Sequence, residues 1–371
     1  MLRRTKLIIA GYCVAGLVLL ALAVAMILQF THWARHPGEF GEHHHHHEEL
    51  EKPEAVPAKT YTLNGKTYLT SPFLETEFDV TQSSVDLAQI FRVNLNTRSF
   101  AVLEELDFVS ADEIGLGERD GVLGVSIGGE EKAYPLRMLN YHIALNDLCG
   151  GREIAVVWDP LTMTPKVFDR KLVRKDGSQL VLSFANLGLV HKGCLLLYDK
   201  QTNSIWWPPE GKCIAGSLNG TVLGHYPFLF VSWAVWKERH PDTRVLSLNT
   251  AFTFRYSRNP YETYYPLPEL PLPVEGWTPG ESPFKWSQPV IALEADGQAK
   301  AYPLFVLLAS QRDIEDSFGG KKIVIHNGTP PYPTDEHGRE IRYSFGAWFL
   351  WSVRYPDIEV YQPDGEEEGE V

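Results

Sequence analysis

The feature that most constrains the fold of this chain is a segment that it contains twice. Residues 122–136 align without gaps to residues 290–304, with seven identities in fifteen positions, and both segments end in Lys-Ala-Tyr-Pro-Leu. A second shared block, Trp-x-x-Arg-x-Pro-Asp, occurs at 236–242 and again at 351–357. Shared segments of this kind indicate that one folding unit is used more than once. We therefore predict two related lobes.

Both copies begin with the same local signals. Alternating apolar residues surround Gly128-Gly129 in the first and Asp296-Gly297 in the second, and such dipeptides supply the positive φ angles that tight hairpin turns need. A proline then follows, Pro135 or Pro303, at a place that suits the first position of a helix, where no backbone hydrogen bond is lost. We expect a hairpin and then a short helix in each lobe.

A strand is expected after each helix. The glycine pairs at 150–151 and 319–320 are suited to end the helices. The mostly apolar segments 154–158 and 323–326 are then predicted to form strands. The predicted unit is ββαβ, used twice. The predicted fold class is therefore α+β, predominantly β, with two related ββαβ lobes preceded by one transmembrane helix.

Composition divides the chain into regions. Eight prolines between 259 and 289 exclude a regular helix or central strand, so this stretch reads as an extended connector that packs through its aromatic residues. The first lobe carries an insertion, roughly 159–231, that the second lacks and that has a hairpin signal at 198–206. The expected regions are a cytoplasmic stub with the transmembrane helix (1–30), a linker rich in His, Glu and Pro (31–60), the first lobe (61–255), the connector (256–289), the second lobe (290–362) and an acidic tail (363–371).

An uncharged apolar run of 24 residues, 7–30, is long enough to cross a bilayer as one helix. Arg3, Arg4 and Lys6 precede it, which predicts an N-terminus in the cytoplasm and export of the rest. We therefore expect a single-pass type II membrane protein whose bulk is periplasmic or extracellular and whose partner is the membrane. A cleaved signal peptide is the alternative, although the apolar run continues beyond the small residues at 23–25.

The charge balance disfavours two classes of partner. The chain has 34 Lys and Arg against 47 Asp and Glu, and three of its basic residues precede the apolar run. Nucleic acids and anionic lipids are bound mainly through Lys and Arg, so an acidic exported region argues against both. We expect a protein or small-molecule partner and no nucleic acid.

Five consecutive histidines stand in the linker, His43, His44, His45, His46 and His47. Two or three neighbouring imidazoles can converge on Zn, Cu or Ni without a folded frame, which makes a weak and unselective site. A polar linker with no metal role is the alternative.

The exported region has three cysteines, Cys149, Cys194 and Cys213. No two of them form a Cys-x-x-Cys pair, so neither a redox pair nor a zinc knuckle is signalled. One disulfide with a spare thiol and three buried inert thiols are both compatible with the sequence.

Several segments together resemble a known family. They are Lys-Ala-Tyr-Pro-Leu-Arg-Met-Leu-Asn-Tyr-His at 132–142, Leu-Leu-Leu-Tyr-Asp-Lys-Gln-Thr-Asn-Ser-Ile-Trp at 195–206, His-Pro-Asp-Thr-Arg-Val-Leu at 240–246 and Asn-Pro-Tyr-Glu-Thr-Tyr at 259–264. On these residues the chain resembles the uncharacterised prokaryotic family known as domain of unknown function 3179, from about 110 to 360. The resemblance implies an exported or membrane-attached protein and implies no activity.

The chain departs from that family at one informative place. Typical members have a Cys-Pro-Leu-Cys segment where this chain has Asp159-Pro-Leu-Thr162. Oxygen ligands thus replace sulfur, and a metal site or disulfide that used those cysteines cannot form here by the same route. His191 and Cys194 stand where relatives more often have a tyrosine and a small polar residue.

Four side chains are the candidates for a site, His142, Asp159, His191 and Cys194. His142 has Ser310 as its counterpart in the second copy, a difference that fits specialisation, although a histidine among apolar residues is more often bonded to a backbone carbonyl. Asp159 ends a strand, where a carboxylate serves as a base, a ligand or a simple turn residue.

Three functions follow from these signals. The missing cysteine pair and the absence of a complete acid, base and nucleophile set favour a ligand-binding or assembly module over an enzyme. A metal-dependent or redox enzyme is the alternative, and it requires the four candidate side chains within about 4 to 6 Å of one another. The third is a metal-buffering protein that works through residues 43–47.

Overall fold

The computed structural model describes residues 55–93, 102–174, 176–252, 255–280, 282–310, 312–328, 330–339 and 341–363. The predicted transmembrane helix, most of the linker with His43–His47 and nearly all of the acidic tail lie outside these ranges. Within them, no helix is both long enough and apolar enough to cross a membrane. The described residues form many strands and few short helices, which confirms an α+β fold that is mostly β.

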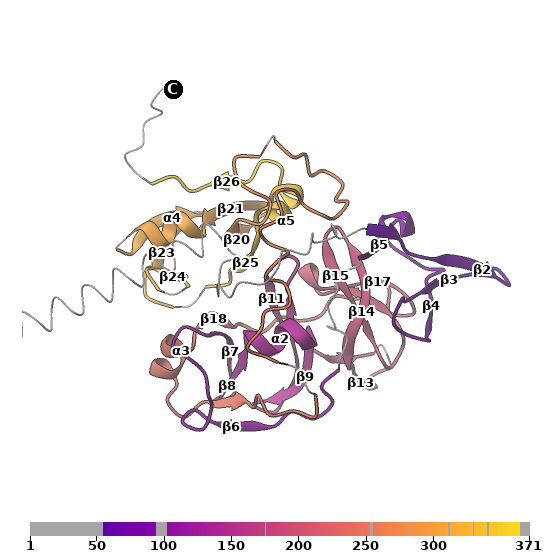
Figure 1. Cartoon of the computed structure of the whole chain (residues 1–371), viewed down its shortest axis with the longest axis horizontal. Helices are drawn as coiled ribbons and strands as arrows, with labels where there is room; N and C mark the ends of the chain where they lie inside the picture. The colour runs from indigo at the N-terminus through magenta and orange to yellow at the C-terminus, as the bar shows by residue number, and fades with distance from the viewer. Residues whose placement is uncertain are drawn as a thin grey trace, which may run out of the picture.

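The first shared segment lies in a five-stranded sheet (Figure 1). In spatial order its strands are β18 (Leu229–Ser232), β7 (Gly121–Ile127), β8 (Glu130–Pro135), β19 (Arg244–Leu246) and β6 (Phe108–Ser110). Gly128 and Gly129, with φ angles of 59° and 81°, turn β7 into β8 as predicted. β19 is parallel to β8, and the other neighbours are antiparallel.

The second shared segment lies in a four-stranded sheet. In spatial order its strands are β25 (Ser344–Ala347), β20 (Pro289–Ala295), β21 (Gln298–Pro303) and β26 (Glu359–Val360). Asp296 and Gly297, with φ angles of 50° and 80°, turn β20 into β21. β26 is parallel to β21, and β25 is antiparallel to β20. This order and these directions match those of β18-β7-β8-β19.

Four α-helices accompany the two sheets in the described residues. They are α2 (Leu136–His142), α3 (Trp233–Arg239), α4 (Leu304–Ala309) and α5 (Trp348–Arg354). α2 and α4 follow the two hairpins, whereas α3 and α5 follow β18 and β25. Pro135 and Pro303 are N-cap residues with ψ angles of 129° and 130°, and not first helical residues, because each still belongs to its strand.

The ββαβ prediction is wrong in one element. After α2 the chain forms β9 (Ala144–Cys149), which pairs along its whole length with β10 (Arg152–Asp159), and Gly150-Gly151 is the turn between them. The helix ends earlier than predicted because Ile143 takes a φ of 58° and its N–H bonds to the carbonyl of Leu139.

The second lobe repeats this difference. β22 (Ile314–Phe318) pairs with β23 (Lys321–His326) around the turn Gly319-Gly320. Each unit is therefore ββαββ, and each glycine pair turns a hairpin. β11 (Thr164–Asp169) and β24 (Tyr332–Asp335) add a third strand to these hairpins, on β10 and on β23 respectively. β11 lies in the middle of the molecule and contacts β25 (Figure 1).

The insertion builds most of a third sheet, which is completed by one strand from the expected linker and one from the start of the expected first lobe. In spatial order its strands are β1 (Ala55–Pro57), β5 (Ile90–Val93), β14 (Phe184–His191), β15 (Cys194–Asp199), β16 (Ile205–Trp207) and β17 (Lys212–Ala215). Tyr198 pairs with Ile205 at the predicted hairpin. Because β5 pairs with β14, the segment 55–93 and the insertion fold together.

The smaller elements are β2 (Thr60–Leu63), β3 (Lys66–Thr70), β4 (Glu77–Asp79), β12 (Lys171–Val173), β13 (Gln179–Val181), η1 (Leu87–Gln89) and η2 (Pro208–Glu210).

The connector packs through its aromatic side chains, as predicted. Tyr261, Tyr264, Tyr265 and Trp286 are each at most 7 % exposed, and burial of such large rings outweighs the loss of regular hydrogen bonding along a proline-rich stretch. Tyr265 donates a 2.7 Å hydrogen bond to the carbonyl of Pro160. The connector is therefore fastened to the turn that follows β10.

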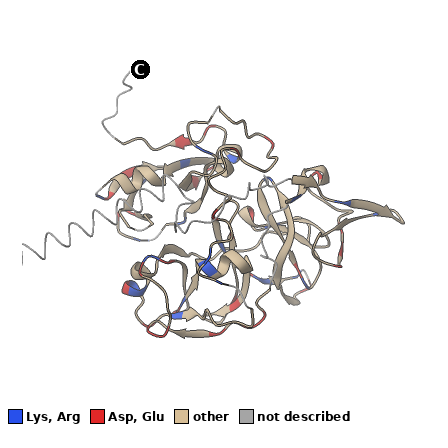
Figure 2. Ribbon diagram, in the orientation of Figure 1, with Lys and Arg blue, Asp and Glu red and all other residues tan. Residues whose placement is uncertain are grey.

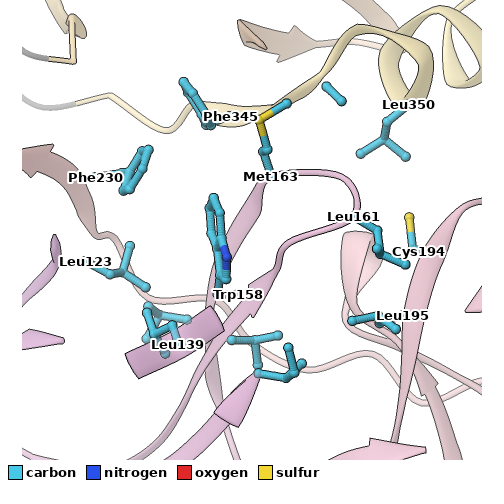
Figure 3. Close-up of a cluster of buried hydrophobic side chains, with 14 of the residues drawn as sticks. Leu123, Leu139, Trp158, Leu161, Met163, Cys194, Leu195, Phe230, Phe345 and Leu350 are labelled. Carbon is cyan, nitrogen blue, oxygen red and sulfur yellow. The ribbon is translucent and has the colours of Figure 1, made fainter. Parts of the chain in front are cut away.

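The two lobes share one hydrophobic core. The rings of Phe230 in β18 and Phe345 in β25 have centroids 5.1 Å apart, and the ring of Trp158 packs against Phe230 at a centroid distance of 5.5 Å. Figure 3 shows these rings together with Met163, which points toward Phe345. The turn between β10 and β11 is thus enclosed between the lobes, and this places β11 at the junction where the site described next is found.

Candidate functional site

The shared Lys-Ala-Tyr-Pro-Leu motif is a structural clamp. In the first lobe, Lys132 Nζ lies 2.9 Å from Asp147 Oδ2, and the Tyr134 hydroxyl donates to the same oxygen at 2.7 Å. Burial, followed by the charge of Asp147, raises the pKa of Tyr134 well above its ordinary value, so the phenol remains a donor. The motif holds β8 to β9 and is occupied by its own partners.

The second lobe has the same clamp. Lys300 Nζ lies 2.8 Å from Asp316 Oδ2, and the Tyr302 hydroxyl donates to that oxygen at 2.9 Å. Although burial acts to raise the pKa of Asp316, the hydrogen bonds from Lys300, Ser317 and Tyr302 hold it below its ordinary value. The residues that the two segments share most visibly therefore serve the fold.

His142 lies in an aromatic setting at the end of α2. Its side chain is 3 % exposed, and Nε2 lies 2.8 Å from the hydroxyl of Tyr256. The ring also packs against Phe252, with centroids 5.3 Å apart. Tyr256 is itself bonded to Thr250 at 2.8 Å. One partner of the His142 ring is therefore a side-chain hydroxyl.

Asp159 is buried and organises the turn after β10. Its Oδ1 accepts the N–H of Leu161 at 2.9 Å, and its Oδ2 accepts the N–H of Leu195 at 2.9 Å. Burial raises the pKa of Asp159 to about 6 in spite of these hydrogen bonds. The Asp159 carboxylate thus ties the turn to β15.

His191 and Cys194 pair with each other at the end of the β14–β15 hairpin. His191 Nδ1 lies 3.2 Å from the carbonyl oxygen of Gln89, and burial lowers its pKa. Cys194 is fully buried, and Figure 3 shows it beside Leu161 and Leu195 in an apolar cluster. Burial raises the pKa of the Cys194 thiol well above its ordinary value. Since the thiolate is the nucleophile and the metal ligand, this environment suppresses both roles.

The structure brings Cys194 close to two of the other candidates, and one of them, His191, is its cross-strand partner. Asp159 approaches Cys194, whose thiol pKa its charge helps to raise, whereas the side chain of His142 is held by Tyr256. In the part of the chain that the structure describes, no three His, Cys, Asp or Glu side chains are grouped so that they could hold a metal ion. Cys149 and Cys213 are also buried and carry free thiols.

Sequence reasoning missed a pocket of about 190 Å³ between the lobes. We call it the interlobe pocket. The first lobe lines it with Lys166 of β11 and with the segment 225–229 before β18, and the second lobe with Pro333 of β24 and the segment 341–343 before β25. Polar groups therefore converge on one space from strands and loops that are distant in sequence.

Lys166 is the most unusual group of the interlobe pocket. Its side chain is 5 % exposed, and its Nζ donates a single long hydrogen bond within the described residues, 3.3 Å to Ser344 Oγ. An ammonium group has three donors, and leaving buried donors unpaired is costly. Burial lowers the pKa of Lys166 to about 8.

A carboxylate lies behind this lysine. Ser344 Oγ donates to Glu294 Oε1 at 3.2 Å, and the other oxygen of Glu294 accepts from Tyr355 at 2.7 Å and lies 3.3 Å from Arg354. Burial acts to raise the pKa of Glu294, but these neighbours hold it below its ordinary value, so the group is ionised. Arg354 already neutralises much of its charge.

Lys166 and Arg342 line the interlobe pocket, and no Asp or Glu is among the described residues that line it. Arg342 is exposed at its rim, and burial, followed by the charges of Lys166 and Arg342, lowers the pKa of His225 to about 4. Elsewhere Lys, Arg, Asp and Glu are interspersed along the ribbon (Figure 2). In a chain with a formal charge of −13, such a concentration of cationic groups favours an anion.

Comparisons with known proteins give one match. A family model with the description "Protein of unknown function (DUF3179)" matches residues 102–360, close to the range expected from the sequence. The matched range includes both shared segments, the insertion and every residue that lines the interlobe pocket. No curated protein and no solved structure matches the chain.

Proposed function

The chain belongs to the DUF3179 family, and on this premise we propose that its exported region is a binding module for a small anion, held in the interlobe pocket. The observation that carries the proposal is the Lys166 ammonium group, which is buried at the wall of this pocket with one long hydrogen bond. An anion would supply the partners that the protein does not. Charge-assisted hydrogen bonds of this kind are among the strongest in proteins.

The volume of the interlobe pocket sets the size of the ligand. Pockets for drug-sized molecules measure roughly 300 to 1,000 Å³. At about 190 Å³ this one is smaller and suits a compact ligand with few non-hydrogen atoms. We therefore propose a small carboxylate or oxyanion and not a nucleotide or a peptide.

We also propose that the two lobes are copies of one ancestral unit. Their sheets have the same order and directions, and both carry the Lys-Tyr-Asp clamp. A pocket at the junction of two such copies is a common arrangement, because small differences between them create one asymmetric site from two similar surfaces. Lys166 is one such difference, since the corresponding strand β24 contributes Pro333 and no lysine to the interlobe pocket.

The location of the module is part of the proposal. The apolar run 7–30 with its preceding basic residues supports a single membrane helix with the lobes on the extracytoplasmic side. Protease added to intact cells is expected to remove the lobes, and their full protection would overturn this orientation. The tract His43–His47 lies outside the described residues, and its weak metal binding stays a prediction.

The binding proposal is tested on the detergent-solubilised full chain. Calorimetry with acetate, pyruvate, phosphate and sulfate is expected to show saturable binding of at least one anion, and Lys166→Met is expected to weaken it at least tenfold. Lys171→Met is the matched control, because it removes the same charge from an exposed position five residues away. Equal affinity of the Lys166 variant and the control would overturn the proposal.

The enzyme alternative receives less support. It needs His142, Asp159, His191 and Cys194 to act together, yet each of the two histidines and the carboxylate has an internal partner. One observation favours a role for this region. The Tyr264 hydroxyl is buried without a hydrogen-bond partner among the described residues, and its pKa is raised by burial and by the charge of Asp159. An activity that Asp159→Asn and Cys194→Ala both abolish would revive this alternative.

A further inference from the structure

Lys166 combines two properties that binding alone does not require. It lies at the wall of the interlobe pocket, and its amine donates to the hydroxyl of Ser344, which in turn donates to the carboxylate of Glu294, so protons can move along this chain. We infer that Lys166 captures small oxo acids covalently, as a reversible imine formed inside the interlobe pocket. This inference rests on the proposed function, since it names the class of anion that the same pocket takes.

The amine of Lys166 is available as a nucleophile. With a pKa of about 8, roughly one side chain in ten is unprotonated at pH 7, whereas an ordinary lysine is almost entirely protonated. Burial of this kind is how proteins obtain reactive lysines that attack carbonyl groups. Among the residues that the structure describes, one hydrogen bond of 3.3 Å holds the amine, so little has to be broken for it to turn toward a ligand.

The reaction balances without any oxidant or reductant. The nitrogen of Lys166 forms a bond to the carbonyl carbon, and the carbonyl oxygen takes up a proton. Loss of that oxygen as one water molecule then leaves a carbon–nitrogen double bond. Ser344 lies between the amine and the ionised Glu294, at 3.3 Å and 3.2 Å, so this pair can take a proton from the nitrogen and return it to the departing oxygen.

The distribution of cationic groups selects an oxo acid over a simple aldehyde. Lys166 is buried, while Arg342 stands exposed at the rim of the same pocket. A ligand with its carbonyl group inward and its carboxylate outward would meet the amine with one end and the guanidinium group with the other. Arginine binds carboxylates through two parallel hydrogen bonds. His225, whose pKa is about 4, stays neutral and does not compete for the carboxylate.

The test is reductive trapping on the full chain. The protein is incubated with pyruvate or glyoxylate, reduced with cyanoborohydride, and analysed by mass spectrometry and peptide mapping. For pyruvate we expect a gain equal to the mass of pyruvic acid less one oxygen atom, located on Lys166 with at least tenfold higher occupancy than on any other lysine. Lactate, which has no carbonyl group, should give no adduct. Equal labelling of many lysines would overturn the inference.

A second variant provides a test that does not depend on whether Lys166 variants fold. Arg342→Gln changes an exposed side chain, so its melting temperature should equal that of the wild type. It is expected to reduce trapping of pyruvate at least fivefold and to reduce trapping of propanal, which lacks a carboxylate, much less, because loss of the Arg342 charge only raises the pKa of Lys166. An equal effect on both compounds would overturn the proposed orientation of the oxo acid and with it the inference.

The failure of this inference can be separated from that of the proposed function. If pyruvate and lactate bind with equal affinity and no adduct forms, covalent capture is wrong while anion binding stands. If neither compound nor any inorganic anion binds, the proposed function itself is overturned.

Discussion

The hydroxyl group of Tyr134 in β8 donates a 2.7 Å hydrogen bond to the carboxylate of Asp147 in β9, the next strand of the same hairpin-helix-hairpin unit. Tyr302 and Asp316 make the corresponding contact at 2.9 Å in the second lobe. The lysine two residues before each tyrosine binds the same carboxylate oxygen. This clamp explains why Lys-Ala-Tyr-Pro-Leu occurs unchanged at both places, because neither its lysine nor its tyrosine can be altered without leaving the carboxylate short of a partner.

The clamp can be measured by removing its cation. In Lys132→Met the Asp147 carboxylate, whose side chain is 10 % exposed, loses its counter-charge, and loss of one partner of a buried pair costs about 3 to 5 kcal/mol. Urea denaturation should show this as a lower midpoint. Lys66→Met is the control, since its pair with Asp79 is largely exposed and solvent screens such pairs until they contribute little. Similar losses in the two variants would contradict a clamp role.

A second prediction concerns the packing of α3 on its sheet. A Cβ atom added at Gly124 would lie 2.2 Å from the Trp236 ring, so Gly124→Ala must displace that ring or the strand. Overpacking of this kind costs about 1 to 3 kcal/mol. Unfolding experiments should show the loss, and near-ultraviolet circular dichroism should show a changed tryptophan signal. Gly115→Ala, where nothing lies within 4 Å of the added atom, should leave both unchanged.

The interlobe pocket predicts a stability that depends on pH. The pKa of Lys166 is about 8 in the folded protein, against an ordinary value of 10.5 for lysine, so between these values the unfolded chain binds more protons than the folded one. Stability contributed by this group therefore rises with pH from about 8 to about 10, and the burial penalty is fully present below pH 8. A shift of this size corresponds to roughly 3 kcal/mol.

Comparison of wild type with Lys166→Met isolates this effect from other titrations. The stability advantage of the variant in urea unfolding should be largest at pH 7 and should shrink toward pH 10. A difference that stayed constant from pH 7 to pH 10 would show that Lys166 is not held in an environment that disfavours its charge.

Sequence reasoning succeeded where the signals were local. Gly128-Gly129 and Asp296-Gly297 turn hairpins because their conformational preferences act within two residues. β9 was mistaken for part of a helix region because Asn146 and Asp147 interrupt its apolar pattern, and only the partners of these two side chains explain their presence in a strand. Gly150-Gly151 was expected to end a helix but turns a hairpin instead. A glycine pair with positive φ angles suits a helix end and a hairpin turn equally well, so the pair alone does not decide between them.

The interlobe pocket could not be found in this way. Lys166 and Ser344 are 178 positions apart, and no motif spacing connects residues that meet only after two lobes pack together. The one available signal for the pocket was a lysine in the short strand Thr164–Asp169. The other side chains of this strand are mostly buried. By contrast, His142 and Asp159 attracted attention as single polar residues, and the structure gives both of them internal partners.

The last prediction distinguishes a buried thiol from a catalytic one. Burial raises the pKa of Cys194 well above its ordinary value and that of Cys213 to about 12, so at pH 8 neither forms a thiolate to a useful extent. In a Cys13→Ser background, iodoacetamide should label these cysteines only after denaturant is added, and Lys171→Met should behave identically. Rapid labelling of Cys194 in the folded protein would instead reveal an accessible, activated thiol. That result would move the site from the interlobe pocket to Asp159 and Cys194, and would favour the enzyme over the binding module.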